Sequence, residues 1–406
     1  MIPRDASQAR CGDDEVVGLD SAAALIRTAQ TWAHDNLVPF NVSLETTLEC
    51  NIRCIHCYNF DRDEPRARRA ACGADGATPE APRLSTDELL RLIGELRDAG
   101  CMFLSLTGGE VLTHPDLFAL LERARDLNMA VQLLTNGTLL RPGVAGRLAR
   151  FPNLLGASVS LYGATAAAHD GITQVTGSFQ RTWDGVERLR AAGVAVRLKF
   201  IVMRQNAHET EAMMAMATAR DFPYSVDLTI TARHDGTNGS LQARIERPQL
   251  ESLYRGPLRP LLPPGRRPPP PAATFNCNCA RGNCAISATG EVYPCISVPW
   301  SAGNVRDQPF AEIWRSSPVF QRIRGLTLDD FPKCAPCPHR GHCTHDRGAA
   351  FNATGDYTGA DPFVCETAAL AHQLAQESSP DSSPDSSPDS SPDSSPARAP
   401  GTPATP

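Results

Sequence analysis

Short apolar runs rich in Val, Ile and Leu alternate with stretches of helical periodicity between residues 38 and about 235. These runs have the length and composition of buried strands. They cover residues 40–46, 101–109, 130–137, 156–163, 195–203 and 225–231. Because helical stretches lie between them, successive strands should run parallel, and we predict an α/β barrel, or part of one, with six strands.

Two helices are predicted from their periodicity. Residues 85–100 have apolar positions spaced by three and four, after a Ser-Thr-Asp-Glu start that is typical of a capped helix. This stretch is expected to be the amphipathic crossover between the first two strands. A second helix is expected over residues 21–37, within an N-terminal lead-in of residues 1–37, with Ser21 as a candidate cap.

Three segments interrupt the periodic pattern. Residues 61–83 are charged and rich in Gly and Pro, which favours a surface loop. Residues 257–274 are Pro-rich and are predicted to be an extended connector, so the barrel domain spans residues 38–256. A small domain follows over residues 275–376. The SSPD repeats of residues 377–406 lack apolar side chains and predict a disordered tail.

Composition narrows the possible partners and the compartment. The net charge of −6 gives no basic field, so we expect no nucleic-acid partner. No apolar run is long enough to cross a bilayer, and the start of the chain lacks a secretory signal, so we expect no membrane contact and a cytoplasmic location. Fourteen cysteines in that reducing compartment indicate metal binding rather than disulfides.

Cys50, Cys54 and Cys57 form a C-x3-C-x2-C triplet directly after the first predicted strand. Three thiolates on one loop at the mouth of a barrel can bind three irons of a cubane cluster. The fourth iron then keeps an exchangeable position, which suits chemistry better than storage. A zinc knuckle that recruits His56 is the alternative.

The remaining cysteines divide into a C-terminal group and three scattered residues. Cys11, Cys72 and Cys101 are poor ligand candidates, and Cys101 is expected to be a small buried hydrophobe at the start of a strand. The C-terminal group consists of Cys277, Cys279, Cys284, Cys295, Cys334, Cys337, Cys343 and Cys365.

The triplet, with His56 before its last cysteine, resembles the signature of the radical S-adenosylmethionine (SAM) superfamily over about residues 38–235. The resemblance implies a partial (βα)6 barrel that binds a 4Fe-4S cluster and SAM. Reductive cleavage of SAM then gives a 5'-deoxyadenosyl radical that abstracts hydrogen from a substrate. Further matches end the predicted strands and imply SAM contacts, although ordinary turns or strand packing would also explain them: Gly108, Gly109 and Glu110 of a GGE motif, Asn136, Ser160 and Lys199.

Residues 275–370 resemble the SPASM extension of radical SAM enzymes, a small cysteine-rich domain that holds auxiliary iron–sulfur clusters. The resemblance implies one complete ligand set, formed by Cys334, Cys337, Cys343 and Cys365. A second set would take Cys279 or Cys277 with Cys284 and Cys295, but Arg347 stands where its last cysteine is expected. Arginine cannot ligate iron. This cluster would then use Cys277, His345 or Asp346, or keep an open iron; structural zinc sites are the alternative for the region.

Auxiliary clusters suit a reaction in which the substrate loses an electron. We therefore expect an oxidoreductase that modifies a ribosomally made peptide and receives electrons from a donor such as flavodoxin or ferredoxin. The alternatives are modification of tetrapyrrole side chains, as in heme or heme d1 biosynthesis, and a sulfatase-maturase-like oxidation of a protein. A non-catalytic iron–sulfur or zinc carrier would not need the triplet with GGE. The sequence identifies no catalytic acid or base.

Overall fold

The computed structural model describes residues 19–59, 82–234, 237–262 and 278–377. Most of the predicted loop over residues 61–83, most of the Pro-rich connector and nearly all of the SSPD tail lie outside these ranges. Cys11, Cys72 and Cys277 also lie outside them.

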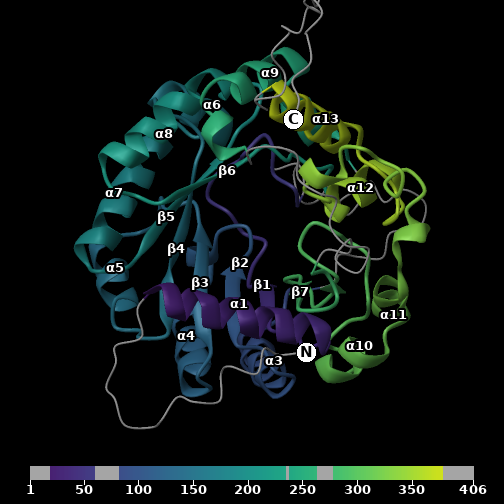
Figure 1. Ribbon diagram of the computed structural model, residues 1–406. Helices are drawn as coiled ribbons and strands as arrows, with labels where there is room; N and C mark the ends of the chain where they lie inside the picture. The colour runs from purple at the N-terminus through teal and green to yellow at the C-terminus, as the bar shows by residue number, and fades with distance from the viewer. Residues whose placement is uncertain (1–18, 60–81, 235–236, 263–277, 378–406) are drawn as a thin grey trace, which may run out of the picture.

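One sheet of eight strands forms the centre of the described structure, in the order β6-β5-β4-β3-β2-β1-β7-β8 (Figure 1). The first six strands pair in parallel, as the alternation of strands and helices predicts. Their bounds are Asn41–Glu45 for β1, Phe103–Thr107 for β2, Ala130–Thr135 for β3, Leu154–Leu161 for β4, Val196–Ile201 for β5 and Tyr224–Asp227 for β6. The predicted α/β fold with a partial six-stranded barrel is confirmed.

The C-terminal domain extends this sheet instead of forming a separate layer. Strand β7 (Asn283–Ile286) lies parallel to β1, with Asn41 opposite Asn283, and β8 (Val292–Tyr293) pairs antiparallel with β7. No sequence pattern predicts this pairing. It places the cysteine-rich segments beside the strand that leads to the Cys50 loop.

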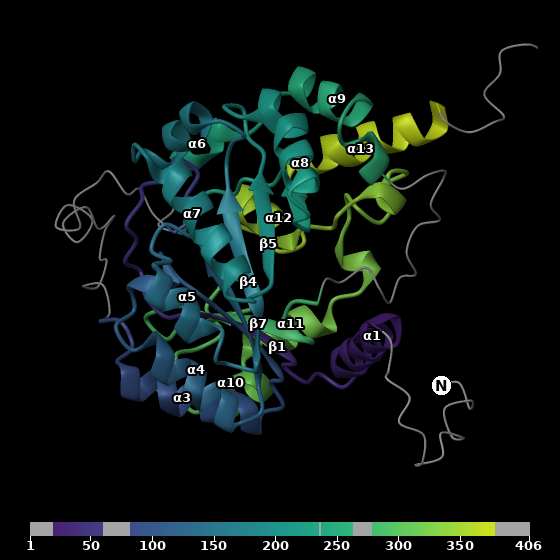
Figure 2. The ribbon, with the colours of Figure 1, turned by 90° about the vertical axis from the view of Figure 1, so that its left-hand side faces the viewer.

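Helices cover the outer side of the parallel strands, and α5 and α7 lie in front of them in Figure 2. In the barrel domain the helices are α3 (Thr86–Asp98), α4 (Leu117–Asp126), α5 (Pro142–Leu148), α6 (Ala166–Thr173), α7 (Ser178–Ala191), α8 (Thr210–Ala219) and α9 (Arg247–Arg255). In the C-terminal domain they are α10 (Phe310–Ser316), α11 (Pro318–Gly325), α12 (Arg347–Thr354) and α13 (Pro362–Glu377). None of the helices in the described ranges has the length and apolar character needed to cross a bilayer.

The predicted crossover helix is α3, and its sequence explains both its start and its packing. The Ser85 side chain accepts from the Glu88 amide, and the Glu88 carboxylate accepts from the Ser85 amide, so the capping box is complete. One face is buried in the core through Leu89, Leu92, Ile93 and Leu96, which follow the spacing of three and four.

Two expected boundaries differ from the structure. The N-terminal helix α1 spans Leu19–Asp35, so Ser21 lies inside its first turn instead of capping it. The start of the connector is not extended, because Arg259–Leu261 form a short 3-10 turn after α9. In both cases the local sequence pattern indicates that an element is present but does not define the residue at which it begins or ends.

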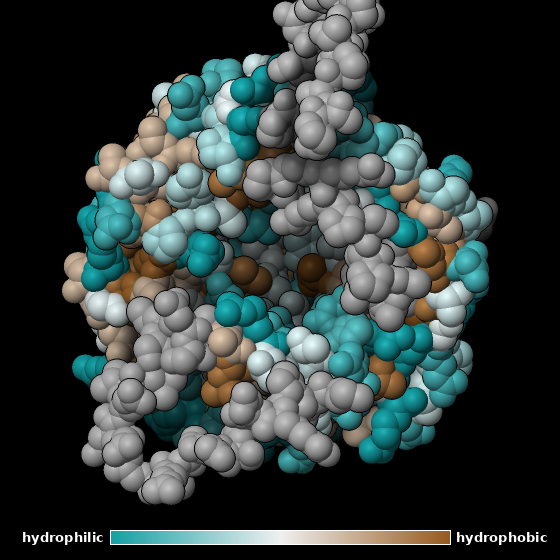
Figure 3. Space-filling view, viewed as in Figure 1, coloured by the Kyte–Doolittle hydropathy of each residue, from teal (hydrophilic) through white to brown (hydrophobic). Residues whose placement is uncertain are grey.

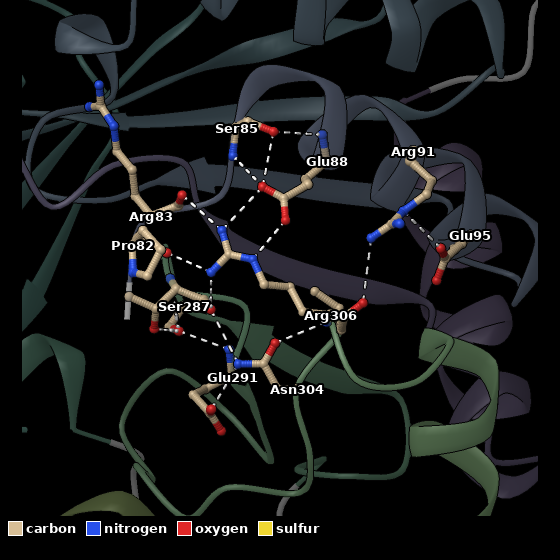
Figure 4. A network of polar contacts seen from close by, with 12 residues as sticks. Pro82, Arg83, Ser85, Glu88, Arg91, Glu95, Ser287, Glu291, Asn304 and Arg306 are labelled. Carbon is tan, nitrogen blue, oxygen red and sulfur yellow. Dashed lines mark hydrogen bonds and ion pairs between the residues drawn. The ribbon is translucent and has the colours of Figure 1, made fainter. Parts of the chain in front are cut away.

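An ion-pair network joins the start of α3 to the C-terminal domain (Figure 4). The Arg306 guanidinium donates to both carboxylate oxygens of Glu88, at 2.6 and 3.1 Å, and to the carbonyl of Arg83 at 2.9 Å. These contacts lower the pKa of Glu88 to about 2, chiefly through the hydrogen bond from Arg306. The same carboxylate therefore caps a helix and docks the C-terminal domain onto the barrel.

Candidate active site and metal centres

The three cysteines of the triplet lie on a loop at the carboxyl end of β1, and each is partly exposed. The backbone fixes this loop on the barrel. The Cys57 amide donates to the Cys54 carbonyl at 3.1 Å, and the amides of Arg53 and Ile55 donate to carbonyls at the end of α6, at 2.9 and 3.1 Å. The loop is therefore held to α6 both between Cys50 and Cys54 and between Cys54 and Cys57.

A cavity of about 150 Å³ lies against the triplet. It brings together residues from the carboxyl ends of four neighbouring strands, as expected when parallel strands end at one edge. Among the residues predicted from sequence, those that line it are Cys50, Cys54, Cys57, Gly108, Gly109, Asn136 and Ser160. The structure therefore gathers most of the predicted cluster and SAM residues around one space.

Gly108 and Gly109 are required by the close approach of two chain segments. The Gly109 amide donates to the Thr47 carbonyl and the Glu110 amide to the Glu49 carbonyl, both at 2.7 Å. A Cβ at Gly109 would lie 2.3 Å from the Glu49 carbonyl oxygen. Gly108 also has φ +144°, a conformation that side chains rarely allow. The glycines thus support the segment that leads into Cys50 as well as lining the cavity.

Glu110, the acidic residue of the GGE motif, points into the protein, with only 1% of its surface exposed. Its carboxylate accepts from the Thr135 hydroxyl at 2.6 Å, the Asn136 amide at 2.7 Å and the Leu112 amide at 3.1 Å. Burial raises the pKa of the Glu110 carboxyl, although the three hydrogen bonds act to lower it. Glu110 is not among the residues that line the cavity, so a contact with the amino group of SAM stays a prediction that this arrangement does not favour.

Asn136 lies directly against the cysteine loop. Its side-chain amide donates to the Asn51 side-chain oxygen at 3.0 Å and points to the Cys50 sulfur at 3.9 Å. Its backbone is held by Glu110, as described above. Glu110 of the GGE motif therefore holds the Asn136 backbone, and the Asn136 side chain in turn contacts the cysteine loop.

A second chamber, of about 270 Å³, shares four residues with the first cavity: His56, Tyr58, Ser160 and Tyr162. Its outer wall carries Lys199, Asp227, Ile296, Ser297 and Asp346, so both domains contribute to it. The Lys199 ammonium lies 3.5 Å from the Asp227 carboxylate. Lys199 thus faces this chamber rather than the cavity at the triplet.

The boundary between the two spaces is aromatic. The His56 and Tyr162 rings meet edge to face, with centroids 4.7 Å apart. Burial, together with the charge of Lys199, lowers the pKa of His56 to about 4. The imidazole is therefore neutral near pH 7 and adds no positive charge beside the triplet.

Asp346 was considered from sequence only as a substitute cluster ligand. In the structure it precedes α12, accepts from the Ala349 amide at 2.8 Å and faces the second chamber. Burial raises its pKa above the usual range. Asp227 was missed, although it ends the sixth strand much as Ser160 lies near the end of the fourth.

An apolar groove of about 460 Å³ lies next to the second chamber, with which it shares the lining residues Asp227 and Thr229. Its walls come from β6, α9, the following turn, residues 341–344 and α13. They include Tyr254, Leu258, Leu262, Phe363, Val364, Thr367 and Ala371, together with Cys343 of the predicted auxiliary ligand set. Figure 3 shows a hollow near the centre of one face of the molecule, with hydrophobic residues on its wall. No local sequence pattern indicates this groove, because segments distant in the chain form it.

The four cysteines of the predicted auxiliary site are neighbours in the described part of the chain, and their role as ligands stays a prediction, because no group of three or more His, Cys, Asp or Glu side chains there is arranged to hold a metal ion. Cys334, Cys337 and Cys343 lie on consecutive turns, and Cys365 comes from α13. Burial raises the pKa of the Cys343 and Cys365 thiols. The charge of Cys334 raises both pKa values further, which indicates that Cys334 lies near these two cysteines. This donor set fits an iron–sulfur cluster.

The other predicted auxiliary set is only partly described. Cys279 and Cys284 are buried, and Cys284 lies on β7 opposite Val42 of β1. Burial raises the pKa of Cys284, and the charges of Cys101 and Cys295 add to the effect. Cys101 is fully buried, as predicted. Arg347 does not extend this set, because its guanidinium points to Cys334 of the complete set.

The family models agree with the two halves of this description. The model of the radical SAM superfamily matches residues 44–217, and that of SPASM, an iron–sulfur cluster-binding domain, matches residues 277–343.

Relatives and solved structures extend the likeness over most of the chain. An AdoMet-dependent heme synthase of Methanosarcina barkeri is 31% identical, across 80% of this chain and 96% of that protein. Mycofactocin maturase MftC of Mycobacterium ulcerans is 28% identical, across 87% and 95%. The fold is similar to that of Streptococcus suis SuiB bound to S-adenosylmethionine, with a TM-score of 0.60, 16% identity and coverage of 85% and 81%.

Proposed function

Because the chain belongs to the radical SAM superfamily and carries a SPASM iron–sulfur domain, we propose that it oxidatively modifies a ribosomally made peptide. A 4Fe-4S cluster and SAM, when bound, supply a 5'-deoxyadenosyl radical that abstracts hydrogen from the substrate. In this proposal Cys50, Cys54 and Cys57 hold that cluster, while Gly108, Gly109, Asn136 and Ser160 contact SAM.

The succession of groove, chamber and cavity, each of which shares lining residues with the next, is the observation that carries the peptide proposal. The apolar groove meets the second chamber at Asp227 and Thr229. The chamber meets the cavity at the triplet across His56 and Tyr162. A peptide backbone in the groove would place one side chain in the chamber, beside the site where SAM is cleaved. The long apolar wall suits an extended chain with hydrophobic side chains.

The chamber would orient the reacting residue through its charged groups. Lys199 and Asp227 form an ion pair at its wall and can exchange this contact for polar groups of the peptide. Ile296 of the C-terminal domain adds an apolar surface to the chamber. Because Lys199 faces the chamber, we place it on the substrate side, and its predicted SAM contact remains to be tested. A cytoplasmic location and a flavodoxin or ferredoxin as electron donor also belong to the proposal.

Transfer of deuterium tests the substrate class directly. The anaerobically reconstituted chain would be given SAM, dithionite and deuterated peptides. These are SuiA, the precursor peptide bound to Streptococcus suis SuiB in a solved structure, and short peptides encoded beside the gene of this chain. Appearance of deuterium in 5'-deoxyadenosine, with a SAM-dependent mass change in a peptide, supports the proposal. No transfer from any peptide, together with transfer from a deuterated tetrapyrrole, contradicts it.

Two variants test the path itself. Thr367→Arg places a long cation in the groove, whereas Ala369→Arg makes a comparable change on α13 outside the groove lining. We expect Thr367→Arg to raise the KM for the peptide at least about tenfold, with unchanged SAM cleavage in the absence of peptide. Ala369→Arg should behave as wild type. Equal effects of the two variants would exclude the groove as the peptide path.

Modification of a tetrapyrrole is the second candidate, favoured by the 31% identity to a heme synthase across 96% of that protein. The same apolar groove would accept one face of a macrocycle, with a side chain reaching the chamber. Deuterium transfer from an iron porphyrin with labelled propionate side chains, and from no peptide, is the outcome that selects this candidate.

A further inference from the structure

Arg347 departs from the sequence pattern of its domain and is also buried. It begins α12, four positions after Cys343, and only 3% of its surface is exposed. A buried guanidinium needs hydrogen-bond acceptors and nearby negative charge to offset the loss of hydration. The groups around the Arg347 guanidinium therefore indicate which part of the protein its positive charge affects.

Backbone carbonyls hold the guanidinium in one orientation. Its Nε donates to the His345 carbonyl at 3.2 Å, and Nη1 donates to the carbonyls of Gly359 at 3.2 Å and Tyr357 at 3.5 Å. The group also lies over the Phe331 ring, 5.1 Å from its centroid. These hydrogen bonds involve Nε and Nη1 of the guanidinium, and the third nitrogen faces the cysteines.

That third nitrogen, Nη2, points to the Cys334 sulfur at 4.0 Å. The charge of Arg347 also acts on Cys343 and Cys365 of the same set. Burial raises the pKa of both thiols, and the nearby guanidinium partly offsets this by lowering it. The acidic groups within reach of the same charge are Asp346 and Asp356; Asp346 is bound to the Ala349 amide and faces the second chamber. The cation thus lies beside three of the four proposed ligands.

We propose that Arg347 raises the reduction potential of the auxiliary cluster held by Cys334, Cys337, Cys343 and Cys365. A reduced cluster carries one more negative charge than an oxidised one, so a fixed cation beside its sulfurs stabilises the reduced form more. Charge and hydrogen bonds at the sulfurs are among the main determinants of such potentials. Arg347 is thus a tuning residue that makes this cluster a better one-electron acceptor.

This inference goes beyond the proposed function and does not depend on the substrate. It rests on the four-cysteine ligand set and on the position of one side chain. Its test therefore needs neither peptide nor SAM, and a failure of the peptide proposal would leave it unaffected.

The experiment is a redox titration followed by electron paramagnetic resonance. It uses the full chain with Cys50, Cys54 and Cys57 replaced by Ala, which removes the signal of the SAM cluster. The signal that disappears on Cys365→Ala is assigned to the cluster beside Arg347. In this background Arg347→Gln and Arg347→Met remove the charge, Arg347→Lys keeps it, and Arg315→Gln removes an exposed charge from the same domain.

We expect Arg347→Gln and Arg347→Met to shift the electron-transfer equilibrium at least about tenfold toward the oxidised cluster, a fall of about 59 mV for one electron. Arg347→Lys should shift it less, and Arg315→Gln should leave it unchanged. An unchanged potential in both neutral variants overturns the proposal. Loss of the cluster from both also overturns it, because Arg347 would then serve assembly, and absence of the signal before any change at Arg347 refutes the ligand set.

Discussion

Gly109→Ala is the substitution that tests most sharply how the barrel supports the triplet. The new Cβ would lie 2.3 Å from the Glu49 carbonyl oxygen and 2.6 Å from both the Glu49 carbonyl carbon and the Leu48 carbonyl oxygen. These atoms are backbone and cannot rotate away, so the segment before Cys50 must move. The movement breaks two hydrogen bonds of 2.7 Å, one to Thr47 and one to Glu49.

Each hydrogen bond contributes about 0.5–1.5 kcal/mol to the free energy of unfolding, and the steric overlap adds to their loss. We therefore expect Gly109→Ala to lower the free energy of unfolding by about 2–4 kcal/mol. It should also lower iron at the triplet while the C-terminal clusters keep theirs.

Urea unfolding and iron analysis measure the two effects. Gly146→Ala is the matched control, because nothing lies within 4 Å of its added Cβ and the site is in α5; it should be neutral or stabilising. If Gly109→Ala lost less than about 0.5 kcal/mol and kept full iron, the support of the Cys50 segment by the glycines would be refuted.

Two further predictions concern buried or paired carboxylates. Glu88→Gln should lower the free energy of unfolding by about 1 kcal/mol at neutral pH, since the Arg306 pair is partly open to solvent. Because the pKa of Glu88 falls from 4.5 to about 2 on folding, this difference is full above about pH 4.5 and shrinks as the pH falls toward 2. Urea unfolding at several pH values checks it, with exposed Glu122→Gln as control; a constant difference would contradict the linkage. Glu110→Gln should cost about 1–3 kcal/mol, because an amide cannot replace every acceptor contact, while the Kd for SAM changes less than about threefold. A tenfold weaker Kd without loss of stability would show instead that Glu110 contacts SAM.

The strands and the loop of three cysteines were predictable because each depends on local sequence. The runs that became β1 to β6 are apolar, bounded by turns and separated by helical stretches, so their parallel pairing follows from order alone. The triplet is defined by a short spacing, whereas the set of Cys334, Cys337, Cys343 and Cys365 is implied by the resemblance to the SPASM extension and stays a prediction. The expectation that residues at the ends of parallel strands gather at one edge accounts for Asn136 and Ser160.

Features set by tertiary packing were not predictable. The short strand β7 carries no strong pattern, and its position beside β1 depends on how the C-terminal domain folds back. The second chamber combines Lys199 with Ser297 and Asp346, which are far apart in sequence. The motif of Glu110 does not show that Thr135 and Asn136 provide donors to its carboxylate, while its SAM contact stays a prediction. The direction of Arg347 likewise depends on carbonyls that only the folded chain assembles.

Joint replacement of Cys50, Cys54 and Cys57 by Ala tests the central claim most directly. After anaerobic reconstitution, iron, sulfide and 5'-deoxyadenosine would be measured with SAM and dithionite. We predict that the variant loses the iron and sulfide of one cluster, keeps those of the C-terminal domain and forms no 5'-deoxyadenosine. Undiminished 5'-deoxyadenosine from the variant, or a wild-type chain that binds zinc in place of iron, would contradict the assignment of SAM cleavage to the triplet.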